Sequence, residues 1–83
     1  MTLQQLEYIL AVDQHRHFTK AAEQCFVTQP TLSAMIQKLE EELDVKIFDR
    51  TRQPIAPTPI GVHILQQAKE ILVQVDNMKQ IIQ

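Results

Sequence analysis

Residues 18–40 read FTKAAEQCFVTQPTLSAMIQKLE, and this stretch decides how the rest of the chain is interpreted. Its first part has small or apolar side chains at helical spacing, which allow another helix to pack closely against it. Residues 25–28 are too short and irregular a segment to be more than a turn. The stretch therefore predicts a short helix, a tight turn and a second helix. The small or apolar positions of the first helix are Phe18, Ala21, Ala22 and Cys25.

The second helix of this stretch has a clear start and two distinct faces. Thr28 is a good N-cap, and Pro30 falls in the first turn, where its missing N–H does no harm. Val27 before the cap and Leu32 after it form a hydrophobic staple. Because successive residues rotate by about 100°, the apolar stripe and the polar face lie on opposite sides, and the polar face carries no acid before Glu41. The stripe is Leu32, Ile36, Leu39 and Leu43, and the polar face is Pro30, Ser33, Ala34, Gln37 and Lys38.

A helix is expected before this pair and a hairpin after it. Thr2 and Gln5 form a capping box that starts the first helix, whose periodicity fades near His15. After the pair, apolar and polar residues alternate well enough to predict a short hairpin. The expected strands are residues 45–48 and 55–56, with residues 49–54 as the loop and Pro57 ending the second strand.

A long helix is predicted to follow the hairpin. Thr58 and Pro59 repeat the cap-plus-proline start, and no helix breaker follows Gly61. Apolar side chains then step by threes and fours, as in the seam of a coiled coil. Such a helix outruns the core of an 83-residue domain, so we expect its seam to bind a second copy. Because no stop signal precedes Gln83, we expect the chain to be the N-terminal piece of a longer protein. The seam is Leu65, Ala68, Leu72, Val75, Met78 and Ile82.

Length and composition limit the possible classes of protein. A chain of 83 residues has room for one small domain, whose marginal core invites help from a partner. The single cysteine, Cys25, excludes an internal disulfide framework and fits a reducing compartment. The chain has neither a stretch approaching the ~20 apolar residues of a membrane span nor a secretory signal. A cytoplasmic protein without membrane contact is therefore expected.

The placement of charge indicates more than its sum does. A net charge of −2, taken over the whole chain, argues against a nucleic-acid partner. Residues 15–38, however, contain three basic side chains against the single acid Glu23, and two arginines share one loop. The acids gather in residues 40–44 and in the two end helices, so one face can be basic while the chain is acidic. The basic residues of interest are Arg16, Lys20 and Lys38, with Arg50 and Arg52 in the loop.

Two helices joined by a tight turn, the second with an acid-free polar face, form the helix-turn-helix arrangement, although a plain helical hairpin has the same pattern. In helix-turn-helix proteins the second helix places its N-terminal residues against base edges in the major groove. Short or amide-bearing side chains suit this task, and arginine at a hairpin tip can reach a minor groove. The predicted base contacts are Gln29, Thr31 and Ser33; the predicted DNA-backbone contacts are Arg16, Lys20, Thr28, Gln37 and Lys38; the predicted wing is Arg50, Thr51, Arg52 and Pro54.

Two other functions are compatible with parts of the same pattern. A protein-interaction module would dock a partner on the long helix, but it has no use for paired arginines in residues 50–54. An enzyme is not expected, and neither is a cofactor, because the chain has no acid–base pair, Cys/His pair or phosphate-cradling glycine loop. His15 and His17 have no third ligand nearby, so no metal site is expected. Cys25, on the apolar face of a helix, is interpreted as a packed thiol.

Five runs of residues resemble the signature of the LysR-type transcriptional regulators. The resemblance covers essentially the whole chain, and it implies a winged helix-turn-helix, a dimerising linker helix and an effector-binding domain that this chain lacks. Glu7-Tyr8, residues 15–18 and Cys25 resemble the peroxide-sensing OxyR branch of that family. The branch implies a response to oxidative stress through cysteines of the effector domain. The five runs are Phe18–Ala22, Val27–Ser33, Ile36–Glu40, Phe48–Thr51 and Thr58–Gly61.

The resemblance also implies site residues, and the sequence departs from the family pattern at two positions. Position 34 is often basic in this family but is Ala34 here, so one phosphate or base contact is absent. Position 44 is commonly glycine but is Asp44 here, and aspartate closes a helix in the left-handed region less easily than glycine. By position, the resemblance supports the loop around Arg52 as the wing, and as groove-facing residues Gln29, Pro30, Thr31 and Ser33.

Together these observations predict a mainly α-helical fold with two functional parts. Residues 1–57 would form a winged helix-turn-helix of three helices plus a β-hairpin, and residues 58–83 a linker and dimerisation helix. The expected function is sequence-specific binding of a homodimer to an interrupted dyad site in double-stranded DNA, with regulation of transcription. The alternative is a helical interaction module that does not bind DNA.

Overall fold

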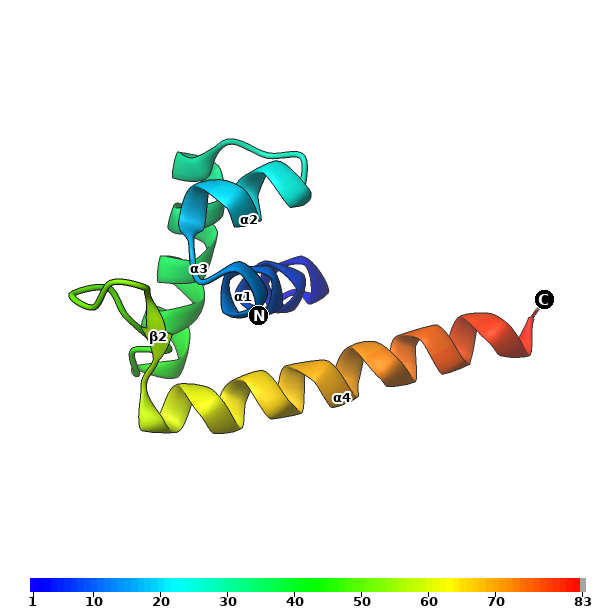
Figure 1. The fold of residues 1–83 in the computed structure, drawn as a ribbon. Coiled ribbons are helices and arrows are strands. Elements are labelled where there is room, and N and C mark those ends of the chain that lie inside the picture. Colours follow the sequence, from blue (N-terminus) through cyan, green and yellow to red (C-terminus); the bar gives the residue numbers. More distant parts are fainter. Residues whose placement is uncertain (83) are drawn as a thin grey trace.

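Four helices and a two-stranded antiparallel hairpin form the fold in the computed structural model, which describes residues 1–82. Helices α1, α2 and α3 pack around one core, and α4 runs beneath them and then extends well beyond them (Figure 1). The predicted mainly helical architecture is therefore confirmed. The elements are α1 Leu3–His15, α2 Phe18–Gln24, α3 Gln29–Leu43, β1 Phe48–Asp49, β2 Ala56–Pro57 and α4 Pro59–Ile81.

The helices begin at side-chain caps, which satisfy backbone N–H groups that have no partner inside a helix. The Thr2 hydroxyl accepts the Gln5 N–H at 3.1 Å, and the Gln5 side chain accepts the Thr2 N–H at 2.8 Å, completing the predicted capping box. Thr28 and Thr58 cap α3 and α4 as predicted. The cap of α2 is His17, whose Nδ1 accepts the backbone N–H of Lys20 at 3.1 Å.

The core lies where α1, α2 and α3 meet. The small residues Ala21 and Ala22 of α2 are buried and let the neighbouring helices approach closely. The predicted stripe of α3 faces inward, although Leu43 at its end is only half-buried. Asp44 closes α3 with φ of 56°, so aspartate adopts the left-handed conformation that glycine would adopt more easily. The largest fully buried side chains are Ile9, Val12, Leu32, Ile36, Leu39 and Ile47.

The hairpin differs from the prediction of a strand over residues 45–48. Strand β1 begins only at Phe48, and Phe48 pairs with Pro57 while Asp49 pairs with Ala56. The Ile47 N–H donates instead to the Glu40 carboxylate at 2.7 Å, and the Ile47 carbonyl accepts the Thr58 N–H at 2.9 Å. Both backbone groups of Ile47 are thereby engaged outside the two-strand ladder. Pro57 is the last residue of β2, so the second strand ends there as predicted, at a position that an edge strand tolerates.

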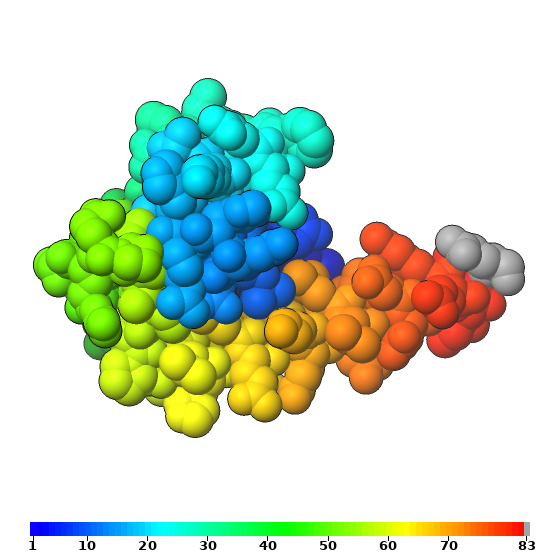
Figure 2. All heavy atoms as spheres, viewed as in Figure 1, coloured from blue at the N-terminus to red at the C-terminus, as the bar shows by residue number. Residues whose placement is uncertain are grey.

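Helix α4 has an inner half within the fold and an outer half beyond it. Leu65 and Ala68 are buried in the common core, so the core extends past the predicted division between residues 57 and 58. At the start of α4, a Cβ added to Gly61 would overlap the Ile47 carbonyl, so the missing side chain lets the helix begin there. The outer half stands clear of the body (Figure 2). None of the helices in residues 1–82 is long and apolar enough to cross a membrane.

Candidate nucleic-acid interface

The N-terminal half of α3 presents a polar face to solvent. Pro30, Thr31 and Lys38 are exposed, and Gln29 and Ser33 are half-exposed. No acidic side chain lies in the first turn of α3, so its free N–H groups and partial positive charge face outward without competition. Of the residues predicted to contact DNA, those on α3 therefore share one accessible face.

The cap of α3 fixes two of the predicted contact residues. Thr28 accepts the Thr31 N–H at 3.4 Å, and the Thr28 hydroxyl also lies 2.8 Å from the Thr31 hydroxyl, to which it donates. The Thr31 hydroxyl is thereby held at the exposed start of α3. Thr28 therefore serves mainly as the N-cap of α3, and a contact with DNA is its secondary role.

Arg50, predicted as a wing residue, is exposed but contacts three side chains of the fold. Its Nη1 donates to the Ser33 hydroxyl at 3.1 Å, and its Nη2 lies 3.6 Å from the Glu40 carboxylate. The guanidinium also lies over the Phe18 ring, 4.6 Å from the ring centroid. These three contacts join the base of the hairpin to α2 and α3. Arg50 remains a predicted wing residue with a side chain that is 38% exposed, but a contact with DNA would compete with these three contacts within the fold.

Glu40 is the residue of this region that the sequence pattern did not single out. Its side chain is 2% exposed, and Oε2 accepts the N–H groups of Ile47 and Phe48 at 2.7 and 3.4 Å. A buried carboxylate requires a cation and hydrogen-bond donors, and Arg50 and these two N–H groups supply them. The available signal was its position beside Leu39 on the inward face of α3, where an acid needs a partner.

The tip of the hairpin remains open to solvent. Residues 51–54 are all exposed. The Asp49 carboxylate accepts the Thr51 hydroxyl at 2.6 Å and the Thr51 N–H at 3.0 Å. These two bonds lower the pKa of Asp49, and the nearby charge of Arg52 acts in the same direction. Thr51 thus serves the turn, and Arg52 is the cation that the wing presents outward.

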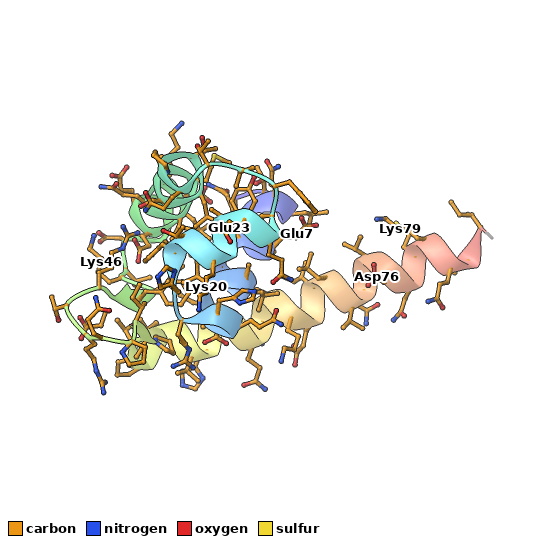
Figure 3. The ribbon with its side chains drawn as sticks, turned by 45° about the horizontal axis from the view of Figure 1, so that its top comes forward. Glu7, Lys20, Glu23, Lys46, Asp76 and Lys79 are labelled. Carbon is orange, nitrogen blue, oxygen red and sulfur yellow. The ribbon has the colours of Figure 1, made fainter. Side chains whose placement is uncertain are left out.

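The remaining predicted cations have different surroundings. Arg16 ends α1 at φ 53°, where it donates to the Asp13 carbonyl at 2.8 Å and pairs with the Asp13 carboxylate at 3.1 Å. Arg16 also lines a hollow against α4 with Lys69, away from the face of α3. Lys46, which was not among the predicted DNA contacts, lines a hollow beside Arg52 at the hairpin. Figure 3 shows Lys20 and Lys46 on the hairpin side of the molecule, whereas Asp76 lies toward the projecting end of α4.

The other polar candidates have partners within the fold. His17 caps α2, and the His15 ring contacts the Gln24 side chain. Cys25 is half-buried at the end of α2. Burial raises the pKa of the Cys25 thiol, and the negative charge of Glu7 raises it further. A thiol with a raised pKa is a poor nucleophile, which agrees with the packing role assigned to it.

The predicted seam of α4 divides between the core and solvent. Leu65 and Ala68 are 6% and 1% exposed, so these two side chains offer no surface to a second copy, and their prediction as dimer contacts needs correction. Leu72 packs partly on the core. Met78 and Ile82, at 70% and 85% exposed, are open to solvent. Val75 is half-buried and lines a shallow hollow with Ile71 and Met78.

The fold and this interface define a DNA-binding domain of the winged helix-turn-helix class. Residues 3–62 match the model of the bacterial regulatory helix-turn-helix proteins of the lysR family, and the chain belongs to that family. It is a DNA-binding domain of a regulator of transcription.

Relatives with established names support a narrower comparison. The chain is 42% identical over 81 residues to the hydrogen peroxide-inducible genes activator of Pectobacterium carotovorum subsp. carotovorum and to the DNA-binding transcriptional dual regulator OxyR of Escherichia coli K12. It is also 42% identical over 78 residues to the HTH-type transcriptional regulator BenM of Acinetobacter baylyi. The matches to the first two cover 98% of this chain and 27% of each relative. The chain thus spans about a quarter of their length.

Solved structures show the same fold. A complex of the BenM DNA-binding domain with benA site 1 DNA superposes with a TM-score of 0.95 at 41% identity, covering 98% of this chain and 91% of that chain. A full-length OxyR variant from Pseudomonas aeruginosa superposes with a TM-score of 0.92 at 44% identity, covering 98% of this chain and 28% of that one.

Proposed function

We propose that this chain reads a specific DNA sequence by inserting the N-terminal half of α3 into the major groove. The observation that carries the proposal is the accessible, acid-free face at the start of α3, where helix N–H groups and short polar side chains point the same way. The similar BenM domain was solved as a complex with DNA, which supports DNA binding by this chain. The protein acts as a regulator rather than an enzyme, in the cytoplasm where the chromosome lies.

The side chains of this face divide into two roles. Gln29, Pro30, Thr31 and Ser33 contact base edges in this proposal, because amide and hydroxyl groups read the major groove by hydrogen bonds. Lys20, Gln37 and Lys38 contact phosphates and fix the register of the protein on the duplex. Arg52 and Lys46 neutralise phosphates or enter the minor groove at the hairpin. Arg16 contributes little, because its charge is already paired with Asp13.

The proposed functional unit is a homodimer held by the outer half of α4. Successive residues of a helix are rotated by about 100°. One side of the outer half of α4 therefore carries Ile71, Val75, Met78 and Ile82. This outer stripe is accessible along its length, and its apolar surface is what a second copy would cover. Two tethered domains would engage two half-sites of an interrupted dyad with avidity ~10²–10⁴-fold above that of one domain.

The signal to which the regulator responds is proposed from its relatives alone. The Pectobacterium carotovorum relative is named for hydrogen peroxide, which favours a regulator of oxidative stress genes. The only thiol of this chain, Cys25, is half-buried with a raised pKa, so we do not assign it the sensing role.

A binding titration tests the central proposal. Duplexes selected from a random pool by the chain itself are labelled, and binding is measured by fluorescence anisotropy between ~50 and ~200 mM salt. We expect affinity to fall by orders of magnitude over this range, and Thr31→Ala to reduce discrimination against a one-base variant by ~1–3 kcal/mol.

The control variant is Gln80→Ala, an exposed polar change near the far end of α4, which should leave both quantities unchanged. If binding hardly depends on salt, or if Thr31→Ala weakens all sequences equally, the role given to α3 is wrong. If no duplex is bound at low salt, the alternative of a protein-interaction module is favoured.

A further inference from the structure

We propose that Arg50 is a positioning residue that turns the Ser33 hydroxyl into a hydrogen-bond donor toward DNA. Ser33 would then select a position where the DNA offers an acceptor, either a base atom such as purine N7 or a phosphate oxygen. The inference rests on the proposed DNA-binding function and assigns to one of its contacts a defined chemistry.

The polarity of Ser33 follows from its single partner. A serine hydroxyl can both donate and accept, whereas a guanidinium only donates. Because Arg50 Nη1 donates to Ser33 Oγ at 3.1 Å, the oxygen is the acceptor in this pair. Within residues 1–82, the Ser33 hydroxyl donates no hydrogen bond, and Ser33 is half-exposed on the face of α3. Its proton is therefore free for an acceptor outside the chain, while the cation behind it disfavours an approaching amino group.

Two contacts besides that with Ser33 keep Arg50 in this place. The Glu40 carboxylate is 2% exposed and 3.6 Å from Nη2, so removing Arg50 would leave a buried charge without its cation. Phe18 lies under the guanidinium, and the Phe18 ring is itself held by an edge-on contact with Phe48 at 6.4 Å between centroids. A phosphate would have to compete with all of these contacts to draw Arg50 outward. Arg50 therefore keeps these contacts when DNA binds.

This arrangement separates the two arginines of the hairpin. Arg52 is exposed at the tip and would neutralise a phosphate, which adds about one unit to the slope of log affinity against log salt. Arg50 would add nothing to that slope, although it affects which bases are accepted. Salt dependence and base selectivity are therefore separate readouts for the two residues.

The test uses a duplex selected by the parent chain, in which each purine is replaced in turn by its 7-deaza analogue and each phosphate by a methylphosphonate. In the parent, we expect one such replacement per half-site to weaken binding about tenfold through loss of a Ser33 bond. The tenfold penalty should vanish in Ser33→Ala and persist in Ser33→Thr, which keeps the hydroxyl. Whether the sensitive position is a 7-deaza or a methylphosphonate site distinguishes a base from a phosphate partner.

The double variant Glu40→Gln with Arg50→Met removes the cation and the acid together, which keeps the net charge and avoids an unpaired buried carboxylate. We expect the double variant to give the circular dichroism spectrum of a folded protein. Replacing the DNA atom that Ser33 contacts should no longer weaken its binding, and its slope of log affinity against log salt should equal the parent's. The matched control Arg52→Met should do the reverse, keeping the penalty and lowering the slope by about one.

Two results would overturn the inference while leaving the proposed function intact. One is a double variant that retains the full Ser33 penalty, since Arg50 then does not set the polarity of that hydroxyl. The other is a slope lowered by about one in the double variant, since Arg50 then contacts a phosphate directly. A parent chain that binds no duplex would instead refute the proposed function, and the inference with it.

Discussion

The inner and outer halves of α4 share one sequence pattern and lie in opposite surroundings. Leu65 and Ala68 are 6% and 1% exposed against the core, whereas Met78 and Ile82 of the same seam are 70% and 85% exposed. Apolar residues at spacings of three and four indicate a buried face, but they do not indicate whether the cover comes from the same chain or from another. A continuous seam can therefore be covered by the same chain at one end and remain available to a second copy at the other.

A glutamate introduced into each half of α4 gives the largest difference in outcome. Ala68→Glu places an unpaired carboxylate at a site that is 1% exposed, in contact with the core. The cost of several kcal/mol is comparable with the total stability of a small domain, so we expect loss of the cooperative unfolding transition. Thermal melting followed by circular dichroism measures this. A melting temperature equal to the parent's would show that α4 is not part of the core.

The second change, Val75→Glu, acts on association instead of folding. Val75 is half-buried on the outer half, and repulsion between two copies in an apolar interface should separate the dimer. We expect a folded monomer whose affinity for a full site falls ~10²–10⁴-fold toward that for a half-site. Sedimentation gives the mass and anisotropy the two affinities. A variant that remains dimeric or binds the full site normally would contradict the proposed interface.

Leu72 lies at the boundary, and its truncation should give an intermediate result. Because Leu72 is partly buried against the core, Leu72→Ala should lower the free energy of unfolding by about 1–2 kcal/mol, less than a fully buried leucine. Urea denaturation with an unchanged m-value is the measurement. The neighbouring Val73→Ala is the matched control, because Val73 is 51% exposed, lies outside the outer stripe and should change stability by less than about 0.5 kcal/mol.

The smallest effect is expected for Met78→Ala. Met78 is 70% exposed, so stability should hardly change, while the dimer loses one apolar contact and dissociates roughly tenfold more readily. Sedimentation equilibrium over a dilution series measures that shift. An unchanged dissociation constant would move the interface away from this part of the helix.

Local features were predictable from the sequence, and those that depend on distant residues were not. The threonine caps of three helices and the stripe of α3 depend on neighbours within a turn, and they were predicted correctly. The bond from Glu40 to the Ile47 N–H spans seven residues of chain and displaced the predicted strand. The set of contacts that Arg50 makes depends on Glu40, Ser33 and Phe18, which only the folded chain brings together.

Charged positions were the least predictable part of the site. Arg50 and Arg52 stand two residues apart in one loop and look alike in sequence. Both are exposed, yet Arg50 pairs with an acid that is 2% exposed, whereas Arg52 makes no ion pair within residues 1–82. Arg16 similarly pairs with Asp13. Whether a basic side chain is free for DNA depends on whether a buried or adjacent acid already holds it, and that is a property of the packed structure.

Because Gly61 lies so close to Ile47 near the start of α4, a change at this contact would tilt the helix and displace its far end. Ile81 ends the helix 20 residues after Gly61, so at about 1.5 Å per residue the far end lies roughly 30 Å from that contact. A tilt of about 5° at this contact would move the far end by about 3 Å, close to the ~3.4 Å rise of one base pair. A side chain as small as a methyl group at position 61 would therefore change the spacing of half-sites that a pair of these domains can span.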